Sequence, residues 1–395
     1  MVRFIHAADL HMDRAFEGLA NLSKQAVKAF TKLNQQVLTN LVSAALANEV
    51  DFLLLAGDTF HQNKPSLKTQ HFFFEEMQRL AEAQIPVYMI FGNHDYYDPQ
   101  RYWFEFPKNV TLFTSETVTT FKGKTKAGET YAISGFSYTQ PWIKAAKATE
   151  FPNRSEVDVH IGLYHGDSQG ERYAPFLLSQ MKAKNYDYWA LGHIHVPTVL
   201  NEQPPIVYPG TTQGHTKKET TTGSQLVEIT AGKSRRQMVQ VAEISWQQVA
   251  IPIETNHPQA VLQQLIAQLQ PIDYQALLSL RLTTKSAKGN FLTENQLLEL
   301  MDYMNELFAR RNQLTWVYEI QQQEEKNRLT LPASTELVTA LLTNYQETTT
   351  FEMIHEELLT HQLAATVLNP AQYQEEILTA VAKELKDDFY WEESK

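Results

Sequence analysis

The sequence predicts an α/β protein with α+β layering, in which two sheets form a core flanked by helices. Over residues 1–253, short apolar runs alternate with stretches of helical spacing, a pattern typical of layered α/β domains. From Ile206 onward the apolar runs follow one another without helices, which indicates a further set of strands. The chain of 395 residues also exceeds the usual size of one core, so we expect two or three domains.

In the first domain, residues 1–253, helical spacing predicts helices at 23–48, 68–83 and 174–184. Apolar runs bounded by polar residues or glycine predict strands. In chain order these strands cover residues 4–8, 52–56, 85–90, 157–164, 188–191, 206–208, 225–229, 237–244 and 249–253.

A second, smaller α/β domain is expected at residues 254–325. Its predicted elements, in order, are a helix at 257–269, a strand at 276–282, a helix at 293–311 and a strand at 314–320. A polar break at 324–332 ends in proline and indicates a linker. Residues 330–395 then form a C-terminal region with predicted helices at 335–345, 351–368 and 371–388.

The net charge of −11 is unevenly distributed along the chain. Residues 1–250 hold 24 Lys and Arg against 24 Asp and Glu, while residues 330–395 hold 3 basic and 12 acidic residues. The acidity therefore belongs to the C-terminal part, and it does not exclude a nucleic-acid partner for the first domain. Small basic clusters on expected loops or helix ends are candidate phosphate contacts, at Lys122, Lys124, Lys126, Lys144, Lys147, Lys182, Lys184, Lys217, Lys218, Arg235, Arg236, Lys285 and Lys288.

The chain has no cysteine, which excludes disulfides, thiolate-bound zinc and iron–sulfur clusters. Any metal must then be held by His, Asp, Glu or Asn side chains. The N-terminus leads directly into a predicted strand, and no apolar run approaches the length that spans a bilayer. We therefore expect a cytoplasmic protein without a membrane partner.

Five predicted strands end in residues that can bind metals or move protons. Because open α/β proteins place their sites at the rim of the sheet, we expect these side chains to lie close together. In chain order they are Asp9 and His11, then Asp58, then Asn93, His94 and Asp95, then His165, and finally His193 and His195.

These donors are suited to a pair of metal ions. Carboxylates, imidazoles and an amide oxygen, without thiolate, suit manganese, iron or zinc. A carboxylate such as Asp58 can bridge two ions about 3.5–4 Å apart, and a hydroxide between the ions would then attack a phosphate. A nearby imidazole could protonate the leaving oxygen.

Each motif alone also has an ordinary explanation. Asp-x-His occurs by chance, Gly-Asp often forms a turn, and Gly-His-x-His can be two surface imidazoles. Five such motifs in sequence, each after a strand, favour function over chance. The remaining histidines match no motif and are assigned to packing or to the surface: His6, His71, His160, His215, His257, His355 and His361.

The motifs resemble those of the calcineurin-like metallophosphoesterases over about the first 215 residues. The resemblance rests on Asp9-x-His11, Gly57-Asp58, Gly92-Asn93-His94-Asp95, His165 and Gly192-His193-x-His195. More narrowly, the sequence is similar to the SbcD branch of double-strand-break repair nucleases. The segments that carry this likeness are Gly57 to His61 with Pro65 and Ser66, and Tyr208-Pro209-Gly210-Thr211. The start, Ala7 to Asp13, is similar to the YhaO-type DNA repair exonucleases of that branch.

This resemblance implies a two-sheet metallophosphoesterase core, a capping domain at 254–325 that helps to hold duplex ends, and a role for each site residue. His94 would be the catalytic imidazole, with Asp95 orienting its ring, and His61 would help to position the phosphate. Asp58 would bridge two divalent ions, for which manganese is the expected metal. The other ligands would be Asp9, His11 and His195 for the first ion, and Asn93, His165 and His193 for the second.

The first interpretation is therefore a manganese-dependent DNA repair exonuclease. A phosphodiesterase for nucleotides or other small diesters is the second, and a metal-binding scaffold subunit without activity is the third. The resemblance also implies that the C-terminal helices, with an apolar stripe at Ile377, Val381 and Leu385, dock an SMC-type ATPase. Packing of that stripe against the chain itself is the alternative, and the sequence leaves a homodimer open.

Overall fold

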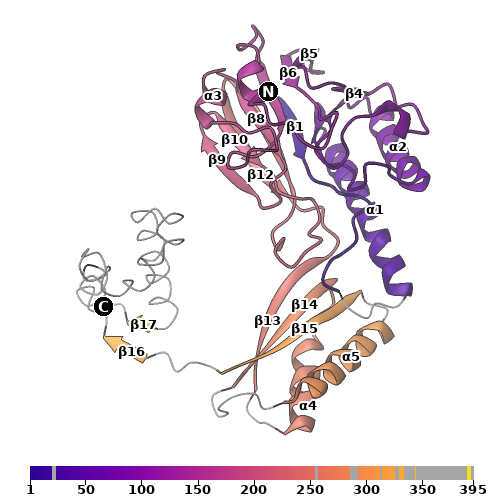
Figure 1. Ribbon diagram of the computed structural model, residues 1–395, viewed down its shortest axis with the longest axis vertical. Coiled ribbons are helices and arrows are strands. Elements are labelled where there is room, and N and C mark those ends of the chain that lie inside the picture. The colour runs from indigo at the N-terminus through magenta and orange to yellow at the C-terminus, as the bar shows by residue number, and fades with distance from the viewer. Residues whose placement is uncertain are drawn as a thin grey trace, which may run out of the picture. The chain divides into compact units, whose positions relative to one another are not determined.

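The computed structural model is shown in Figure 1. It describes residues 1–19, 24–253, 257–284, 292–311, 314–324, 329–332, 343 and 389–392. The chain divides into two compact units. Unit 1 comprises Met1–Ile251, Leu262–Arg281 and Thr293–Gln321, and unit 2 comprises Pro252–Val261, Leu282–Leu292 and Gln322–Lys395.

The first large sheet of unit 1 has the strand order β12-β11-β1-β2-β3-β4. Strands β1 to β4 are parallel to one another, whereas β11 runs antiparallel to β1 and β12 antiparallel to β11. The strands are β1 (Val2–Ala7), β2 (Phe52–Ala56), β3 (Val87–Ile90), β4 (Val110–Leu112), β11 (Ser224–Thr230) and β12 (Lys233–Val239).

The second large sheet has the order β5-β6-β7-β8-β10-β9. Its inner strands β6, β7, β8 and β10 are parallel, and its two edge strands are antiparallel to their neighbours. The strands are β5 (Thr119–Lys124), β6 (Thr130–Gly135), β7 (Val159–His165), β8 (Tyr188–Gly192), β9 (Thr198–Glu202) and β10 (Pro205–Tyr208).

The two large sheets pack face to face around an apolar core. Every residue of β2 and of β7 is buried, as expected for strands that are covered on both faces. Aromatic rings join the sheets directly, since the ring centroid of Phe4 in β1 lies 5.4 Å from that of Tyr188 in β8. This packing holds the strand ends of both sheets at one edge.

Helices cover the outer faces of the two sheets (Figure 1). Helices α1 (Lys24–Ala47) and α2 (Leu67–Glu82) bury Leu41 and Met77 against Leu53 and Met89 of the first sheet. Ser66 caps α2, because its hydroxyl accepts a hydrogen bond from the Thr69 backbone N–H at 3.1 Å. On the outer face of the second sheet, α3 (Leu178–Lys182) and the 3₁₀ turn Lys147–Glu150 both contribute side chains to one apolar cluster.

A third sheet of order β13-β14-β15 is formed by β13 (Ser245–Pro252), β14 (Ala276–Thr284) and β15 (Thr315–Glu324). Its helices are α4 (Pro258–Leu269) and α5 (Glu294–Arg310), and Asn305 of α5 exchanges two hydrogen bonds with the Val317 backbone. In unit 2, β16 (Leu329–Pro332) pairs in parallel with β17 (Phe389–Glu392). No helix of the described residues is long and apolar enough to cross a membrane.

The predicted two-sheet α/β architecture is confirmed, and several individual elements differ from prediction. The helix predicted at 174–184 is shortened to α3, because Pro175 disfavours helical backbone before it and Ala174 has a φ of 42°. The strand predicted at 237–244 lies earlier in the chain than expected. Strand β12 begins at Lys233, after the turn at Ala231 and Gly232, and ends at Val239.

Among the described residues the sequence prediction missed six strands, β4, β5, β6, β9, β16 and β17, and β16 occupies the end of the linker predicted at 324–332. The edge strands β5 and β9 lack long apolar runs and expose polar side chains, and β4 has only 3 residues. Apart from residue 343, the helices predicted at 335–345, 351–368 and 371–388, with their ATPase-docking stripe, lie outside the described residues. The domain limits 1–253, 254–325 and 330–395 stay predictions.

Glycine at three strand ends lets the polar segments of the two sheets approach closely. A Cβ atom at Gly92 would lie 2.2 Å from the Asp58 carboxylate, and one at Gly57 would lie 2.4 Å from His165 Nδ1. At Gly192 an added Cβ would lie 2.0 Å from the carbonyl oxygen of Ala56, which is part of the rigid backbone of β2. The contact between β2 and β8 therefore requires glycine at position 192.

Gly192→Ala tests this close approach between the sheets. Because the backbone of Ala56 cannot move away without disturbing β2, the substitution should lower the free energy of unfolding by roughly 1–3 kcal/mol. Urea denaturation of the metal-free protein measures the effect.

Gly170→Ala is the matched control. The nearest atom to its added methyl group is the carboxylate end of Asp167, at 3.1 Å, which can rotate away. This variant should remain within about 0.5 kcal/mol of the parent protein. Equal stability of the two variants would contradict the argument for position 192.

Candidate metal centre

The predicted donor residues come together at the carboxyl ends of β1, β2, β3, β7 and β8. Four of them adopt left-handed backbone: Asp9 (φ 52°), His11 (φ 45°), Asp58 (φ 51°) and His193 (φ 104°). Such conformations are costly for side-chain-bearing residues and are concentrated at functional sites. Backbone hydrogen bonds hold the first two turns together, since Asp9 N donates to Gly57 O and His11 N to Asp58 O.

One group of donors consists of Asp9, His11 and His195, whose ligand atoms lie within 4.8 Å of one another. His11 Nε2 lies 3.1 Å from His195 Nε2 and 3.9 Å from the Asp58 carboxylate. His195 Nε2 is also 3.8 Å from the Asp9 carboxylate. Two imidazole nitrogens and two carboxylates thus face a common point.

A second group surrounds the other side of Asp58. His165 Nε2 lies 3.5 Å from the Asp58 carboxylate and 3.1 Å from the Asn93 side-chain oxygen. His193 Nδ1 lies 3.1 Å from the same Asn93 oxygen. Asp9 also reaches this side, because its carboxylate lies within 4.8 Å of the donors of Asp58 and His165. The two groups therefore meet at the two carboxylates.

The burial of these carboxylates indicates a site for cations. Asp9 is fully buried and Asp58 is 1% exposed, and among the described residues their ion-pair partners are histidines, without Lys or Arg. Burial raises the pKa of Asp9, against the attraction of His195 and His165, and the charge of Asp58 raises it further. Divalent ions would supply the positive charge that two such carboxylates need.

The imidazoles are suited to bind such ions. Burial, together with the charge of neighbouring imidazoles, holds the pKa of His11 well below its usual value and lowers that of His193 to about 3. Both rings are therefore neutral near pH 7, which is the form that binds a metal. The residues present fit the predicted pair of divalent ions.

Hydrogen bonds fix which nitrogen of two rings faces the donors. His165 Nδ1 lies 2.9 Å from the carbonyl oxygen of Ala56, so its Nε2 is the atom on the Asp58 side. His195 Nδ1 lies 2.6 Å from Glu219, whose role the sequence did not predict. Burial lowers the pKa of His195, but Glu219 and Asp9 together outweigh that effect and raise it above its usual value.

His94 and His61 lie beside the donor groups. Their rings are stacked, with centroids 4.6 Å apart, and both rings meet His11 edge-on at 5.1 and 5.2 Å. His94 Nδ1 lies 3.2 Å from the carbonyl oxygen of His61, and the backbone N–H of His94 donates to Asp58 Oδ1 at 2.9 Å. The His61 backbone thus holds the ring of His94.

Asp95 has a different position from the one expected. Its two oxygens accept hydrogen bonds from the backbone N–H groups of Gly92, Asp58, Thr59 and Phe60, at 2.7–3.3 Å. The expected contact with the ring of His94 is replaced by the His61 carbonyl. Asp95 therefore orders the backbone that carries Asp58, which corrects the predicted role.

The histidines outside the motifs lie where the sequence assigned them, as far as they are described. His6, His160 and His215 are fully buried, and the His71 side chain is 60% exposed. His355 and His361 lie outside the described residues.

Besides Glu219, two other side chains near the site were missed by sequence analysis. The ring of Tyr173 lies 4.5 Å from that of His193, and Arg14 contacts Glu219 at 3.4 Å. Neither stands in a recognisable motif, and only the folded chain brings them to the strand ends.

Several members of the basic clusters are engaged in other contacts. Lys147 is buried and pairs with Glu150, Lys184 donates to the Thr149 carbonyl, and Arg236 pairs with Glu202. Lys122 and Lys124 lie on strand β5, and Arg235 and Arg236 on β12, rather than on the expected loops.

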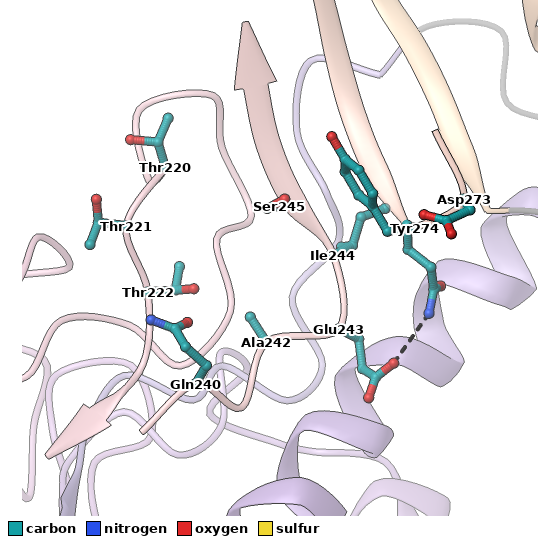
Figure 2. A pocket seen from close by; sticks show the side chains of 11 residues that line it. Thr220, Thr221, Thr222, Gln240, Ala242, Glu243, Ile244, Ser245, Asp273 and Tyr274 are labelled. Atoms are coloured by element: carbon teal, nitrogen blue, oxygen red, sulfur yellow. Dashed lines mark hydrogen bonds between the residues drawn. The ribbon is translucent and has the colours of Figure 1, made fainter. Parts of the chain in front are cut away.

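A separate pocket of about 560 Å³ in unit 1 is lined by other residues (Figure 2). Glu243 and Asp273 contribute carboxylates to it, and the described residues of its lining include no Lys or Arg. Glu243 accepts hydrogen bonds from Gln275 at 3.2 Å and Asn40 at 2.6 Å. The negative charge disfavours a phosphate there, so the strand ends remain the candidate active site.

The part of the chain that carries these strand ends matches a known protein family. Residues 2–197 match the calcineurin-like phosphoesterases. The uncharacterized metallophosphoesterase YhaO of Bacillus subtilis is 36% identical over 270 residues, which cover 67% of this chain and 66% of YhaO.

More distant relatives include two proteins named for DNA repair or nuclease function. The DNA double-strand break repair protein Mre11 of Methanopyrus kandleri is 24% identical over 227 residues, 53% of this chain and 48% of its own length. A component of the nuclease SbcCD of Bacillus subtilis is 31% identical over 95 residues, 24% of this chain and 22% of its own length. The chain thus spans no more than about two thirds of these relatives. Through the domain that carries the converging donors, the chain belongs to the calcineurin-like metallophosphoesterase family.

Proposed function

We propose that the chain is a DNA repair exonuclease that uses two divalent ions, with manganese as the expected metal. The observation that carries the proposal is the pair of donor groups that meet at Asp9 and Asp58, with His94 beside them. Family membership supports phosphoester hydrolysis, and relatives named as a nuclease and as a double-strand break repair protein support DNA as the substrate.

In this proposal Asp58 serves both ions. Its contacts with His11 on one side and His165 on the other, at 3.9 and 3.5 Å, support that role. Asp9, His11 and His195 would complete the first site, and Asn93, His165 and His193 the second. When bound, two such ions would activate a water molecule and neutralise phosphate charge.

His94 is proposed as the group that exchanges a proton with the leaving oxygen. Its Nδ1 is held by the His61 carbonyl, which leaves Nε2 for the substrate. The stacked ring of His61 limits the rotation of His94, and this supports a positioning role for His61. Asp95 acts one step further away, by ordering the turn that presents Asp58.

The function is tested on several substrates with manganese. The protein should shorten linear duplex DNA, and chelation of the metal should abolish this activity. Closed plasmid and hairpin DNA measure cleavage that needs no free end, and bis-p-nitrophenyl phosphate measures general diester hydrolysis. Cleavage of the small diester with no attack on DNA would instead favour the second interpretation, an enzyme for small phosphodiesters.

Asp58→Ala should remove both ions, because the substitution deletes the carboxylate that faces both donor groups. His195→Ala should weaken the binding of one ion and leave the other ion bound. Elemental analysis after gel filtration gives the manganese content of each variant. Two bound ions in Asp58→Ala would contradict the bridging role.

His94→Ala should lower the rate of hydrolysis roughly 100-fold or more without loss of metal, since general acid catalysis typically contributes that much. The measurements are the single-turnover rate and the manganese content. His71→Ala, at an exposed position of α2, is the control and should keep the parent rate. Loss of manganese from His94→Ala would make His94 a ligand instead.

A further inference from the structure

We propose that Glu219 is a positioning residue for the metal ligand His195, and that it fixes the ring form in which Nε2 is free to bind an ion. The inference rests on the metal pair of the proposed function and does not depend on the substrate. Glu219 lies in the polar loop between Thr211 and Thr222, outside every motif that the sequence analysis identified.

The two oxygens of Glu219 have separate tasks. Oε1 lies 2.6 Å from His195 Nδ1 and 3.4 Å from the Arg14 guanidinium. Oε2 accepts hydrogen bonds from the backbone N–H groups of His215 at 2.7 Å and Thr216 at 3.0 Å. One oxygen therefore holds the loop, and the other holds the imidazole.

The contact determines where the proton of His195 lies. An ionised carboxylate only accepts hydrogen bonds, so the proton of the neutral ring must lie on Nδ1. The lone pair is then on Nε2, the atom that lies 3.1 Å from His11 Nε2 and 3.8 Å from Asp9. A carboxylate behind a ligating histidine also raises the basicity of the ligand nitrogen and restrains the ring.

The loop segment that precedes Glu219 is anchored at several points. The Thr211 hydroxyl donates to the Asp9 carbonyl at 2.7 Å, and the Trp246 indole N–H donates to the Gly214 carbonyl at 2.9 Å. Gln213 adds a hydrogen bond to the carbonyl of Ile244. Because these contacts hold the loop, the Glu219 side chain, which is mostly buried, can act as a fixed support.

Glu219→Gln changes the proton arrangement with little change in shape. The two backbone N–H groups of residues 215 and 216 require an acceptor, so the glutamine oxygen should take the place of Oε2. Its NH₂ group then faces His195 Nδ1 and donates to it. The ring proton must move to Nε2, where it blocks the atom that would bind the ion.

The experiment measures metal binding and ring form separately, in the full-length protein. In manganese titrations followed by electron paramagnetic resonance, Glu219→Gln should bind one of two ions about 10- to 100-fold more weakly. In metal-free protein, at a pH well above the raised pKa of His195 so that the ring is neutral, ¹⁵N NMR of the histidine rings should give His195 protonated on Nδ1 in the parent and on Nε2 in the variant. The His195→Gln spectrum assigns the signals.

Glu76→Gln is the control for loss of a buried carboxylate. Glu76 is 6% exposed and contacts Thr39 and Arg79 on α1 and α2, away from the donor groups. This variant should keep the parent affinity for both ions and the parent ring form of His195.

Two outcomes would overturn the inference. The first is a parent His195 protonated on Nε2, which wild-type protein alone can reveal. The second is a Glu219→Gln variant that binds both ions as the parent does. A variant that loses both ions, and whose metal-free form melts at a lower temperature, would also count against the inference, because that result is expected for a purely structural residue. Failure of the parent to bind two ions would count against the proposed function, while the ring form still decides the role of Glu219.

Discussion

Two carboxylates buried side by side need positive charge close to them, and the strand ends of this protein are arranged around that requirement. Asp9 and Asp58 leave adjacent parallel strands of one sheet, where packing against the second sheet excludes water. The described structure surrounds them with imidazoles and an amide oxygen rather than Lys or Arg. A protein that only needed stability would fill this position with apolar side chains. The arrangement is therefore best understood as preparation for cations.

The geometry of the site is built from backbone as much as from side chains. Glycines at 57, 92 and 192 allow the sheets to approach, and left-handed residues turn the chain immediately after the strands. Backbone carbonyls then hold rings in place, as Ala56 does for His165 and His61 for His94. Asp95 gives support in the reverse way, because here a side chain holds the backbone: its carboxylate accepts hydrogen bonds from backbone N–H groups of the turn around Asp58. Such support reduces the reorganisation needed when metal or substrate binds.

Much of this arrangement could be predicted from sequence, for a physical reason. Buried parallel strands appear as continuous apolar runs, and the polar residue after each run marks the edge of the sheet, so Asp9, Asp58 and His165 could be placed without coordinates. The contacts of Asp95 and Glu219 could not be predicted, because they depend on the path of loops and not on periodicity. The helix predicted at 174–184 failed at Pro175, where local backbone restriction outweighs the apolar pattern. Edge strands such as β5 were missed because half of their side chains face water.

The order of the donors along the chain has a consequence for synthesis. Asp9, His11, Asp58 and Asn93 belong to the first sheet, whereas His165, His193 and His195 are translated later, with the second. Strand β1 must also wait for β11, since Val2 pairs with Ile229. A nascent chain thus carries both carboxylates with a single imidazole ligand, His11, until the second sheet emerges from the ribosome. The complete donor set is absent from every intermediate that ends before His195, so the two donor groups can meet only after the second sheet has been made.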